Sequence, residues 1–474
     1  MRRRVDILSS TDWLSVFFYV VLVVFGWMNI YAVNLSSDNQ FHFDLTNRYS
    51  MQILWMLVCA GIAITLFLVD SRFFSFMSYG FYGISIILLL AVLVVGHEVN
   101  NSRSWISLGG FSIQPSEFAK LGTMLALSRY LSGYNIKSSS LKSIVVSLGI
   151  VALPALFILL QPDVGSMMVF VAFLLVLYRF GLPGWVLLVI LYIVLVFLGT
   201  LTIPGHALLL LLVGSAIILY FILEQNLKNG LLAIIVTAGS ISLTYILEKI
   251  ELLTFNIYLN TLVGVGIAVL VALIIAISKK QSKVFIVIAT LITFIGFTYS
   301  VGFVFDNVMK EHQQKRVKIM LGLESDPYGY EYNVRQSKIA IGSGGFSGKG
   351  FLQGTQTKYK FVPEQSTDFI FCTVGEEWGF LGSFFFVVVF IGFLIRLIVV
   401  AERQRAKFSK IFGYCVVSIL FFHFGVNIAM TIGLFPVIGI PLPFISYGGS
   451  SLMAFTTMVF IFLRLDATRK FYLI

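Results

Sequence analysis

The chain has 474 residues, of which 58% are hydrophobic and only 12% are charged, and its mean hydropathy is +0.95. These values exclude a water-soluble globule and predict an integral membrane protein. The formal net charge of +11 accompanies no recognisable nucleic-acid-binding module, so nucleic acid is not an expected partner. Cys59, Cys372 and Cys415 lack paired spacing, and the five histidines form no H-x-x-x-H pattern, so neither a disulfide framework nor a zinc site is expected.

Apolar stretches recur along the chain, each long enough to cross a hydrocarbon core as a helix of about 17 to 25 residues. About fourteen such spans are predicted, at 13–33, 51–69, 79–95, 113–131, 144–160, 164–182, 185–201, 206–223, 231–247, 258–277, 284–304, 369–400, 411–435 and 452–465. The sequence therefore predicts an all-α fold, a polytopic transmembrane helical bundle.

Basic residues in the short loops set the expected orientation, because Lys and Arg accumulate on the cytoplasmic side of a membrane. The loops that this rule places inside include those with Arg2, Arg3 and Arg4 and with Arg469 and Lys470. Both termini are therefore expected in the cytoplasm, and the long loop 305–367 on the outer face.

The outer loop 305–367 carries nine Lys or Arg residues against six acids. A long loop is exported regardless of its charge, so the expected orientation stands. The loop is either a solvated surface or a basic surface for an anionic ligand at the outer leaflet, such as a lipid diphosphate. Its glycine-rich run 341–350 lacks the Walker A spacing at Ser343 and Gly350 and is expected to form tight turns.

Charged residues within predicted spans are costly and therefore candidates for function. Glu117 and Lys120 are three residues apart on one helix face and able to pair. They either form a structural ion pair or line a substrate cavity. Asp163 begins another span, where it is either a helix cap or a further site residue.

Asp368 stands where the polar loop re-enters an apolar segment that continues to Val400. A carboxylate at that position is costly unless it is solvated or paired, so it is a candidate functional group. The alternative is a helix-start carboxylate stabilised by the N-terminal amides. Glu376 and Glu377, further into the same segment, are either structural or line the cavity.

The segment 433–451 contains three prolines and four glycines, so it cannot be an uninterrupted helix. Irregular backbone at membrane depth is tolerated only where it is buried in protein or lines a wet cavity. The pattern predicts a cavity that is open to the outer face and faces the loop with Asp368.

Ordered motifs lie at 102–106, 114–120, 161–163, 336–345, 367–371, 375–377 and in the Pro-Gly-rich run that ends at Ser451. In these motifs the chain resembles the SEDS (shape, elongation, division and sporulation) family of polytopic peptidoglycan glycosyltransferases. The run 348–350, Gly-Lys-Gly, followed by Gly-Thr-Gln at 354–356, is similar to the rod-shape-determining (RodA) branch. The resemblance favours a role in elongation over one in division.

The resemblance implies a core of about ten spans, whereas this chain has about four more between Leu201 and Val304. We therefore expect four parts: 1–201 and 368–474 as the two parts of the membrane core, 202–304 as inserted spans, and 305–367 as an extracytoplasmic basic loop. An even number of inserted spans keeps that loop on the outer face. The inserted spans are either a docking surface or an elaboration.

The resemblance implies polymerisation of lipid II, a disaccharide-peptide on undecaprenyl diphosphate, at the outer face of the bacterial cytoplasmic membrane. Asp368 is then the expected general base for the acceptor sugar hydroxyl. The residues expected to bind the substrate are Arg316, Lys338, Arg103, Glu117, Lys120 and Asp163. The family also implies a divalent cation, magnesium or manganese, although the sequence shows no dedicated cage for it.

The expected partners are a class B penicillin-binding protein transpeptidase, other membrane proteins of the elongation complex, and membrane lipid. Two other functions use the same features. A lipid II flippase would also have a basic outer vestibule, intramembrane charges and broken helices. A scaffold that organises wall-synthesis partners would need no catalytic group.

Overall fold

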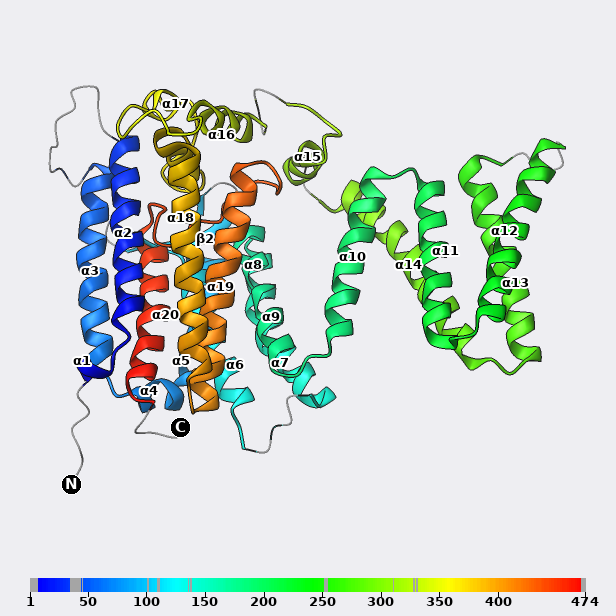
Figure 1. The fold of residues 1–474 in the computed structure, drawn as a ribbon, viewed down its shortest axis with the longest axis horizontal. Helices are drawn as coiled ribbons and strands as arrows, with labels where there is room; N and C mark the ends of the chain where they lie inside the picture. The colour runs from blue at the N-terminus through cyan, green and yellow to red at the C-terminus, as the bar shows by residue number, and fades with distance from the viewer. Residues whose placement is uncertain are drawn as a thin grey trace. The chain divides into compact units, whose positions relative to one another are not determined.

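A computed structural model of the chain describes residues 7–34, 44, 46–99, 102–108, 111–134, 136, 139–250, 255–309, 311–326, 329 and 331–469. Arg2, Arg3, Arg4 and Lys470, used above to predict the orientation, lie outside the described residues. The described residues form helices and one small antiparallel sheet, as Figure 1 shows. The predicted all-α membrane bundle is thereby confirmed.

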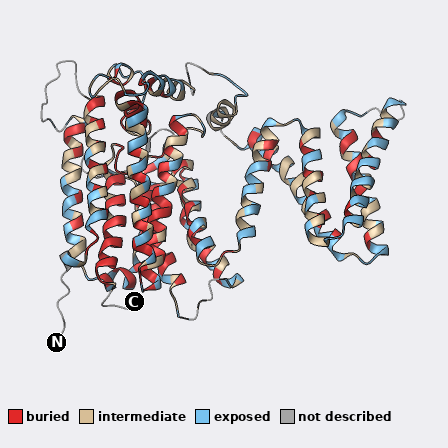
Figure 2. Cartoon of the chain, viewed as in Figure 1, coloured by how far each residue is buried: buried red, intermediate tan, exposed pale blue. Residues whose placement is uncertain are grey.

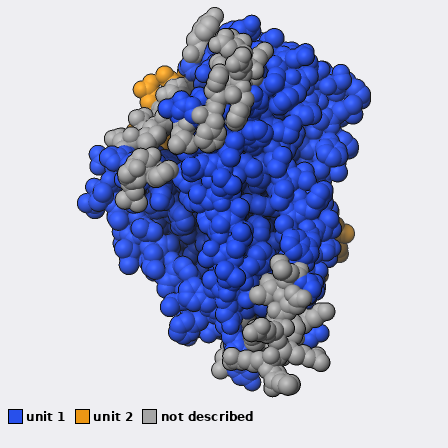
Figure 3. All heavy atoms as spheres, turned by 90° about the vertical axis from the view of Figure 1, so that its left-hand side faces the viewer, with its two compact units in different colours: residues 1–184, 325–474 blue, residues 185–324 orange. Residues whose placement is uncertain are grey.

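The chain divides into two compact units, coloured separately in Figure 3: unit 1 comprises 1–184 and 325–474, and unit 2 comprises 185–324. The helices of unit 1 are α1 (Ile7–Ser10), α2 (Trp13–Asn34), α3 (Arg48–Leu68), α4 (Ser71–Phe76), α5 (Ser78–Val95), α6 (Pro115–Leu131), α7 (Leu141–Leu160), α8 (Val164–Val169), α9 (Ala172–Arg179), α16 (Tyr332–Ser343), α17 (Thr355–Lys358), α18 (Ile370–Glu402), α19 (Lys407–Thr431) and α20 (Gly449–Ala467). Its sheet has the order β1 (His97–Val99), β2 (Ser102–Leu108) and β3 (Phe111–Ile113). The remaining helices are α10 (Gly184–Thr202), α11 (Gly205–Glu224), α12 (Leu227–Lys249), α13 (Ile257–Ser278), α14 (Ser282–Asn307) and α15 (Glu311–Met320).

Twelve helices of the described residues are long and apolar enough to cross a membrane, so the prediction of about fourteen spans is corrected at two places. The predicted span 113–131 is α6, a helix of 17 residues that is mostly buried in protein and therefore tolerates charges. The predicted span 164–182 is two short helices, α8 and α9. They are separated by a tightened turn in which Phe170 N and Val171 N each donate to the carbonyl three residues earlier.

The core of unit 1 is built around α20, which packs against α3, α6 and α19. In the most apolar 18-residue stretch of α20, 89% of the residues are buried inside the protein, whereas in that of α3 only 17% are. Figure 2 shows this contrast. A helix enclosed by protein on every side has no lipid-facing stripe. The polar side chains that face it must therefore find partners inside the bundle.

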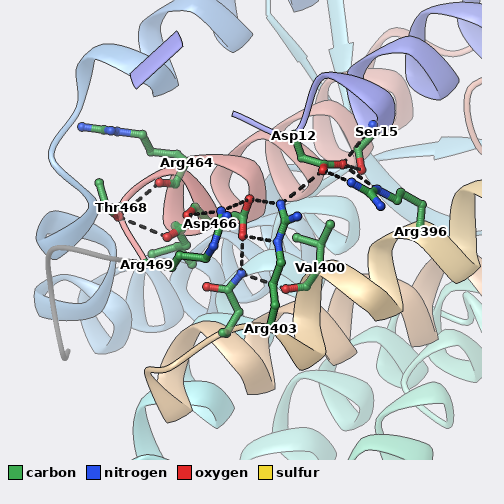
Figure 4. A network of polar contacts seen from close by, with 11 residues as sticks. Asp12, Ser15, Arg396, Val400, Arg403, Arg464, Asp466, Thr468 and Arg469 are labelled. Atoms are coloured by element: carbon green, nitrogen blue, oxygen red, sulfur yellow. Dashed lines mark hydrogen bonds and ion pairs between the residues drawn. The ribbon is translucent and has the colours of Figure 1, made fainter. Parts of the chain in front are cut away.

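An ionic network, shown in Figure 4, joins the C-terminal end of α18 to the start of α2 and the end of α20. Arg396 and Arg403 both bond to Asp12, and Arg403 also bonds to Asp466. Gln404 and Arg469 complete the shell of donors around Asp466, at 2.6 and 3.0 Å. These contacts bring the start of α2 and the end of α20 to the same end of unit 1.

Asp368 lies at the opposite end of unit 1, because it immediately precedes α18 whereas Arg403 follows that helix. The 33 residues of α18 correspond to a length of about 50 Å at 1.5 Å per residue. The candidate site and the ionic network are thus separated by roughly the thickness of a bilayer including its headgroups.

Unit 2 has its own apolar core, which includes Leu209, Leu212, Val213, Ile288 and Leu291. It has a half-open cavity of about 440 Å³ at the ends of its helices and a smaller half-open one of about 110 Å³. Both cavities are lined by unit 2 residues alone. The expected insertion 202–304 lies within this unit, and its role as an insertion stays a prediction.

The ionic network predicts an acid-dependent loss of stability. Burial alone would raise the pKa of Asp12, but hydrogen bonds from Arg396 and Ser15 and the charge of Arg403 hold it at about 2, below the ordinary 3.8. A depressed carboxyl pKa stabilises the fold above the ordinary value, here by roughly 2 kcal/mol, and the contribution is lost as the pH falls through about 2.

We therefore expect Asp12→Asn to lower the melting temperature of detergent-solubilised protein at pH 7. The difference from the wild type should shrink below about pH 4 and vanish near pH 2. Scanning fluorimetry across that pH range measures both proteins. A difference that stays constant with pH would show that the Asp12 carboxylate does not supply this stability.

Candidate active site at the start of helix α18

Asp368 lies on a turn-rich loop, residues 363–369, and its side chain is half-buried. The N-cap of α18 is Phe369, so Asp368 stands one residue outside the cap position. The loop approaches the irregular segment between α19 and α20 closely, since a Cβ on Gly439 would lie 3.5 Å from Asp368 Oδ2. Asp368 is therefore not the N-cap of α18, and its role as a site residue stays a prediction.

The Pro-Gly-rich segment is not helical, as predicted: α19 ends at Thr431 and α20 begins at Gly449. Its deepest part is buried in protein, where the ring of Phe444 contacts Tyr19, Phe393 and Phe455. A Cβ on Gly26 of α2 would lie 2.5 Å from Phe444 O, so only glycine leaves room for this backbone. The segment thus satisfies the burial condition, and the wet cavity stays a prediction.

The Asp368 loop is hydrogen-bonded to this irregular segment and to α19 through three consecutive carbonyl groups. Ser366 O accepts from Tyr447 N at 2.8 Å, and Thr367 O accepts from Ser446 Oγ at 2.5 Å. Asp368 O accepts from Asn427 Nδ2 at 2.8 Å. The predicted apposition of the two segments is confirmed by these contacts.

Arg48, at the start of α3, is a neighbour of this loop that the motif analysis missed. Its Nη1 donates to Ser366 Oγ at 2.5 Å, and its guanidinium lies 5.7 Å from the centre of the Tyr447 ring. The signal in the sequence is a single arginine before a span on the predicted outer side, where basic residues are under-represented. It adds a cation beside the Asp368 loop.

Lys338 lies on α16, which packs on the residues that follow Asp368. Phe369 and Cys372 form a buried cluster with Ala340 of that helix. Ser337 Oγ donates to Thr431 O at 2.9 Å, which fixes α16 against the end of α19. The exposed Lys338 lies beside Gly433, so the structure brings this predicted residue to the same elements as Asp368.

Glu117 and Lys120 form a buried ion pair at 2.8 Å, with side chains 3% and 1% exposed. Lys120 Nζ also lies 3.0 Å from His423 Nε2, while His423 Nδ1 lies 3.2 Å from Pro441 O. The carbonyl requires a proton on Nδ1, which leaves Nε2 to accept from Lys120. These contacts favour the structural interpretation of the pair, as a support for the irregular segment.

Asp163 caps α8, since its Oδ1 accepts from Ser166 N at 2.9 Å, and its Oδ2 accepts from Gln114 Nε2 at 3.0 Å. Gly165, two residues after Asp163, lies against Ile438 O. The helix-cap interpretation of Asp163 therefore holds, and the cap borders the irregular segment.

The two remaining predicted residues come from other elements. Arg103 is an exposed residue of β2, opposite Glu98 in the β1–β2 ladder. Arg316 lies on α15 in unit 2, whereas the other predicted site residues lie in unit 1. Neither is brought to Asp368 by a contact described above.

The glycine-rich part of the long loop 305–367 docks on α18 where that helix is interrupted. Gly379 has φ 64° and ψ −160°, so the carbonyls before it lose their helical partners. Two of them, on Glu376 and Glu377, instead accept from Lys349 N at 3.1 Å and Gly350 N at 2.9 Å. Residues 344–350 form tight turns and a close backbone approach, as predicted, whereas 341–343 are the end of α16.

The Glu376 carboxylate, fully buried, holds the following turn of this loop. It pairs with Lys349 Nζ at 2.6 Å and accepts from the backbone N of Gln356 at 2.8 Å and of Thr357 at 2.9 Å. The Gly-Lys-Gly and Gly-Thr-Gln runs thus share one structural role, which is to wrap around a single carboxylate. Glu376 is therefore structural, one of its two predicted interpretations.

The described residues form no group of three or more His, Cys, Asp or Glu side chains able to hold a metal ion. The divalent cation implied by the family resemblance stays a prediction.

Comparison with known proteins assigns the family. The family model described as "Cell cycle protein", whose name joins FtsW, RodA and SpoVE, matches residues 12–211 and 232–471. The peptidoglycan glycosyltransferase RodA of Treponema pallidum is 30% identical over 449 residues, which cover 95% of this chain and 96% of the relative. The chain belongs to the SEDS family.

The predicted family, of RodA type, is thereby confirmed. The peptidoglycan glycosyltransferase MrdB of Escherichia coli is 29% identical over 390 residues, 82% of this chain and 77% of that relative. The fold resembles that of the RodA variant from Thermus thermophilus, with a TM-score of 0.57 and 21% identity over 97% of this chain and 98% of the other. A chain from a peptidoglycan synthase complex gives a TM-score of 0.63 at 23% identity, over 98% of this chain and 99% of that chain.

The buried carboxylate of this SEDS chain predicts how its outer loop is held. In Glu376→Gln the amide group replaces an anion that accepts from four donors, so Lys349 and the turn at 354–357 lose their anchor. Hydrogen–deuterium exchange should rise about tenfold at the amides of Gln356 and Thr357, equivalent to about 1.4 kcal/mol of local opening.

The control is Glu324→Gln, which alters an exposed glutamate of the long loop 305–367 that lies outside the turn at 354–357. It should leave exchange at both amides unchanged. Equal exchange in Glu376→Gln and the wild type would contradict the anchoring role.

Proposed function

We propose that the protein polymerises lipid II into glycan strands at the outer face of the cytoplasmic membrane, during cell elongation and shape maintenance. The observation that carries this proposal is the Asp368 carboxylate, half-buried on a loop that is fixed by hydrogen bonds on both sides. Membership of the SEDS family and relatives named peptidoglycan glycosyltransferase support the same activity.

In the proposed reaction, an Asp368 oxygen takes the proton of the acceptor sugar hydroxyl. The hydroxyl oxygen then forms a bond to the donor's anomeric carbon. The bond between that carbon and the lipid diphosphate breaks, and the diphosphate leaves with the electron pair. Each turnover extends the glycan by one disaccharide and releases one undecaprenyl diphosphate.

Charge on the leaving diphosphate requires cations close to the Asp368 loop. Lys338 and Arg48 lie on elements packed against this loop and suit that role best. Arg316 and Arg103 remain proposed substrate contacts from the family resemblance alone. Glu117, Lys120 and Asp163 act in this proposal as supports of the irregular segment, within the site they were predicted to serve.

The proposed sidedness follows from the length of α18. With both chain ends in the cytoplasm, as the basic loops predict, Asp368 at the far end of this helix faces the outer leaflet. Lipid II presented there would place its diphosphate at headgroup depth, beside the basic loop. We also propose a class B penicillin-binding protein as partner, in line with the synthase complex whose chain shares this fold.

A purified preparation separates this activity from that of a flippase or a scaffold. The wild type, supplied with lipid II in detergent, should form glycan polymer. Asp368→Ala should slow polymer formation at least about 100-fold, the usual contribution of a general base, while its melting temperature stays close to that of the wild type.

The matched control is Asp70→Asn, which changes an exposed carboxylate at the cap of α4 and keeps a capping side chain. It should polymerise at the wild-type rate. Polymer formed by Asp368→Ala at the wild-type rate would refute the base. Transfer of labelled lipid II across liposomes without polymer would favour a flippase, and partner binding with neither activity would favour a scaffold. Parallel assays with and without EDTA test the divalent cation.

A further inference from the structure

We propose that Asn427 is a positioning residue for the reaction, which holds Asp368 in place through the Asp368 backbone carbonyl. This inference rests on the proposed function and adds a residue to its site. The site motifs do not include Asn427, which lies about one turn before the C-terminal end of an apolar helix, α19.

Both amide protons of Asn427 are used at once. The fully buried Nδ2 donates to Asp368 O at 2.8 Å and to Ile440 O at 2.7 Å. One side chain thus joins the catalytic loop to the irregular segment and fixes both against α19. An amide is the only uncharged side-chain group that offers two such donors in one plane.

We call the hydrogen bonds that hold this loop the clamp. Besides those of Asn427, the clamp has two bonds to the residues just before Asp368. Ser446 Oγ and Tyr447 N hold the carbonyls of Thr367 and Ser366, so the three residues that end at Asp368 are fixed in sequence. Ser446 Oγ also accepts from Leu442 N at 2.8 Å, which closes a turn within the irregular segment. The loop is therefore held by hydrogen bonds rather than by regular secondary structure.

The irregular segment to which Asn427 bonds is itself buried and held by further contacts. Ile440 and Leu442 are 1% exposed, and the neighbouring Pro441 O faces His423 Nδ1 at 3.2 Å. His423 lies one helical turn before Asn427 on the same face of α19, so the two side chains hold adjacent carbonyls of one segment. Asn427 can therefore hold Asp368 against this segment.

Asn427 is a positioning residue because its contacts are to backbone carbonyls, not to the carboxylate of Asp368. Without it, the buried carbonyls of Asp368 and Ile440 both lose a donor, and the loop relaxes towards other partners. A displacement of about 1 Å at a catalytic group costs up to about 100-fold in rate. Binding of lipid II by the surrounding cations would be little changed.

The test compares polymerisation kinetics of Asn427→Ala with those of Asn29→Ala. Asn29 is also fully buried in unit 1, but its side chain donates only within its own helix, to Phe25 O at 2.8 Å. We expect kcat to fall about 10- to 100-fold in Asn427→Ala, with KM for lipid II within about twofold of the wild type. Asn29→Ala should keep both constants near wild-type values.

A double-variant cycle separates positioning from a general structural effect. If Asn427 acts through Asp368, adding Asn427→Ala to Asp368→Asn should cause no further loss of kcat. Losses that multiply in the double variant would overturn the inference, as would a wild-type kcat in Asn427→Ala. A wild type that forms no polymer would instead refute the proposed function.

Ser446→Ala and Ser446→Thr decide the question if Asn427→Ala does not fold. Ser446→Ala removes one bond of the same clamp and should lower kcat with KM unchanged. Ser446→Thr keeps the hydroxyl and should restore at least part of that loss. Equal kcat in Ser446→Ala and the wild type would overturn the role of the clamp.

Discussion

The carbonyl groups of Ser366, Thr367 and Asp368 belong to neither a helix nor a sheet, yet they lie where α18 enters the bundle and each accepts a hydrogen bond. Backbone groups removed from water must be paired inside the protein, and this constraint organises the whole site. The donors come from α19 and from the irregular segment that follows it. The Asp368 loop is therefore held in place by the segment to which it is bonded.

That segment is rigid because its own polar groups are satisfied from several directions. His423 and Asn427 face the carbonyls of Pro441 and Ile440, and the Glu117–Lys120 pair keeps His423 in the tautomer that can donate to Pro441. Phe444 anchors the segment among the rings of the core. Charges inside the bundle thus support the proposed site from within the core.

Much of this arrangement follows from the sequence. Long apolar runs predict the spans, the cost of a carboxylate at the end of a span points to Asp368, and prolines and glycines after Thr431 predict a broken helix. The errors have a common cause. Hydropathy reports only that the residues of α6, α8 and α9 are apolar enough to be buried. The length of α6 and the break between α8 and α9 depend on the protein that surrounds these helices, which hydropathy does not describe.

Arg48 and Asn427 could not be predicted because neither belongs to a local motif. Arg48 is joined to Ser366 across 318 residues of sequence, and Asn427 to Asp368 across 59. Only the fold brings such residues together. The docking of the glycine-rich loop on Glu376 is likewise set by the interruption at Gly379, which a helical hydropathy pattern does not reveal.

The proposed chemistry depends on where the acceptor sugar lies when lipid II is bound. The most direct measurement is a cryo-electron microscopy structure of the wild-type protein with bound lipid II and an unreactive donor analogue. We predict that the acceptor hydroxyl lies about 3 Å from a carboxylate oxygen of Asp368, with the loop 363–369 still bonded to Asn427 and Ser446. An acceptor hydroxyl held against a different carboxylate, or remote from this loop, would contradict the account.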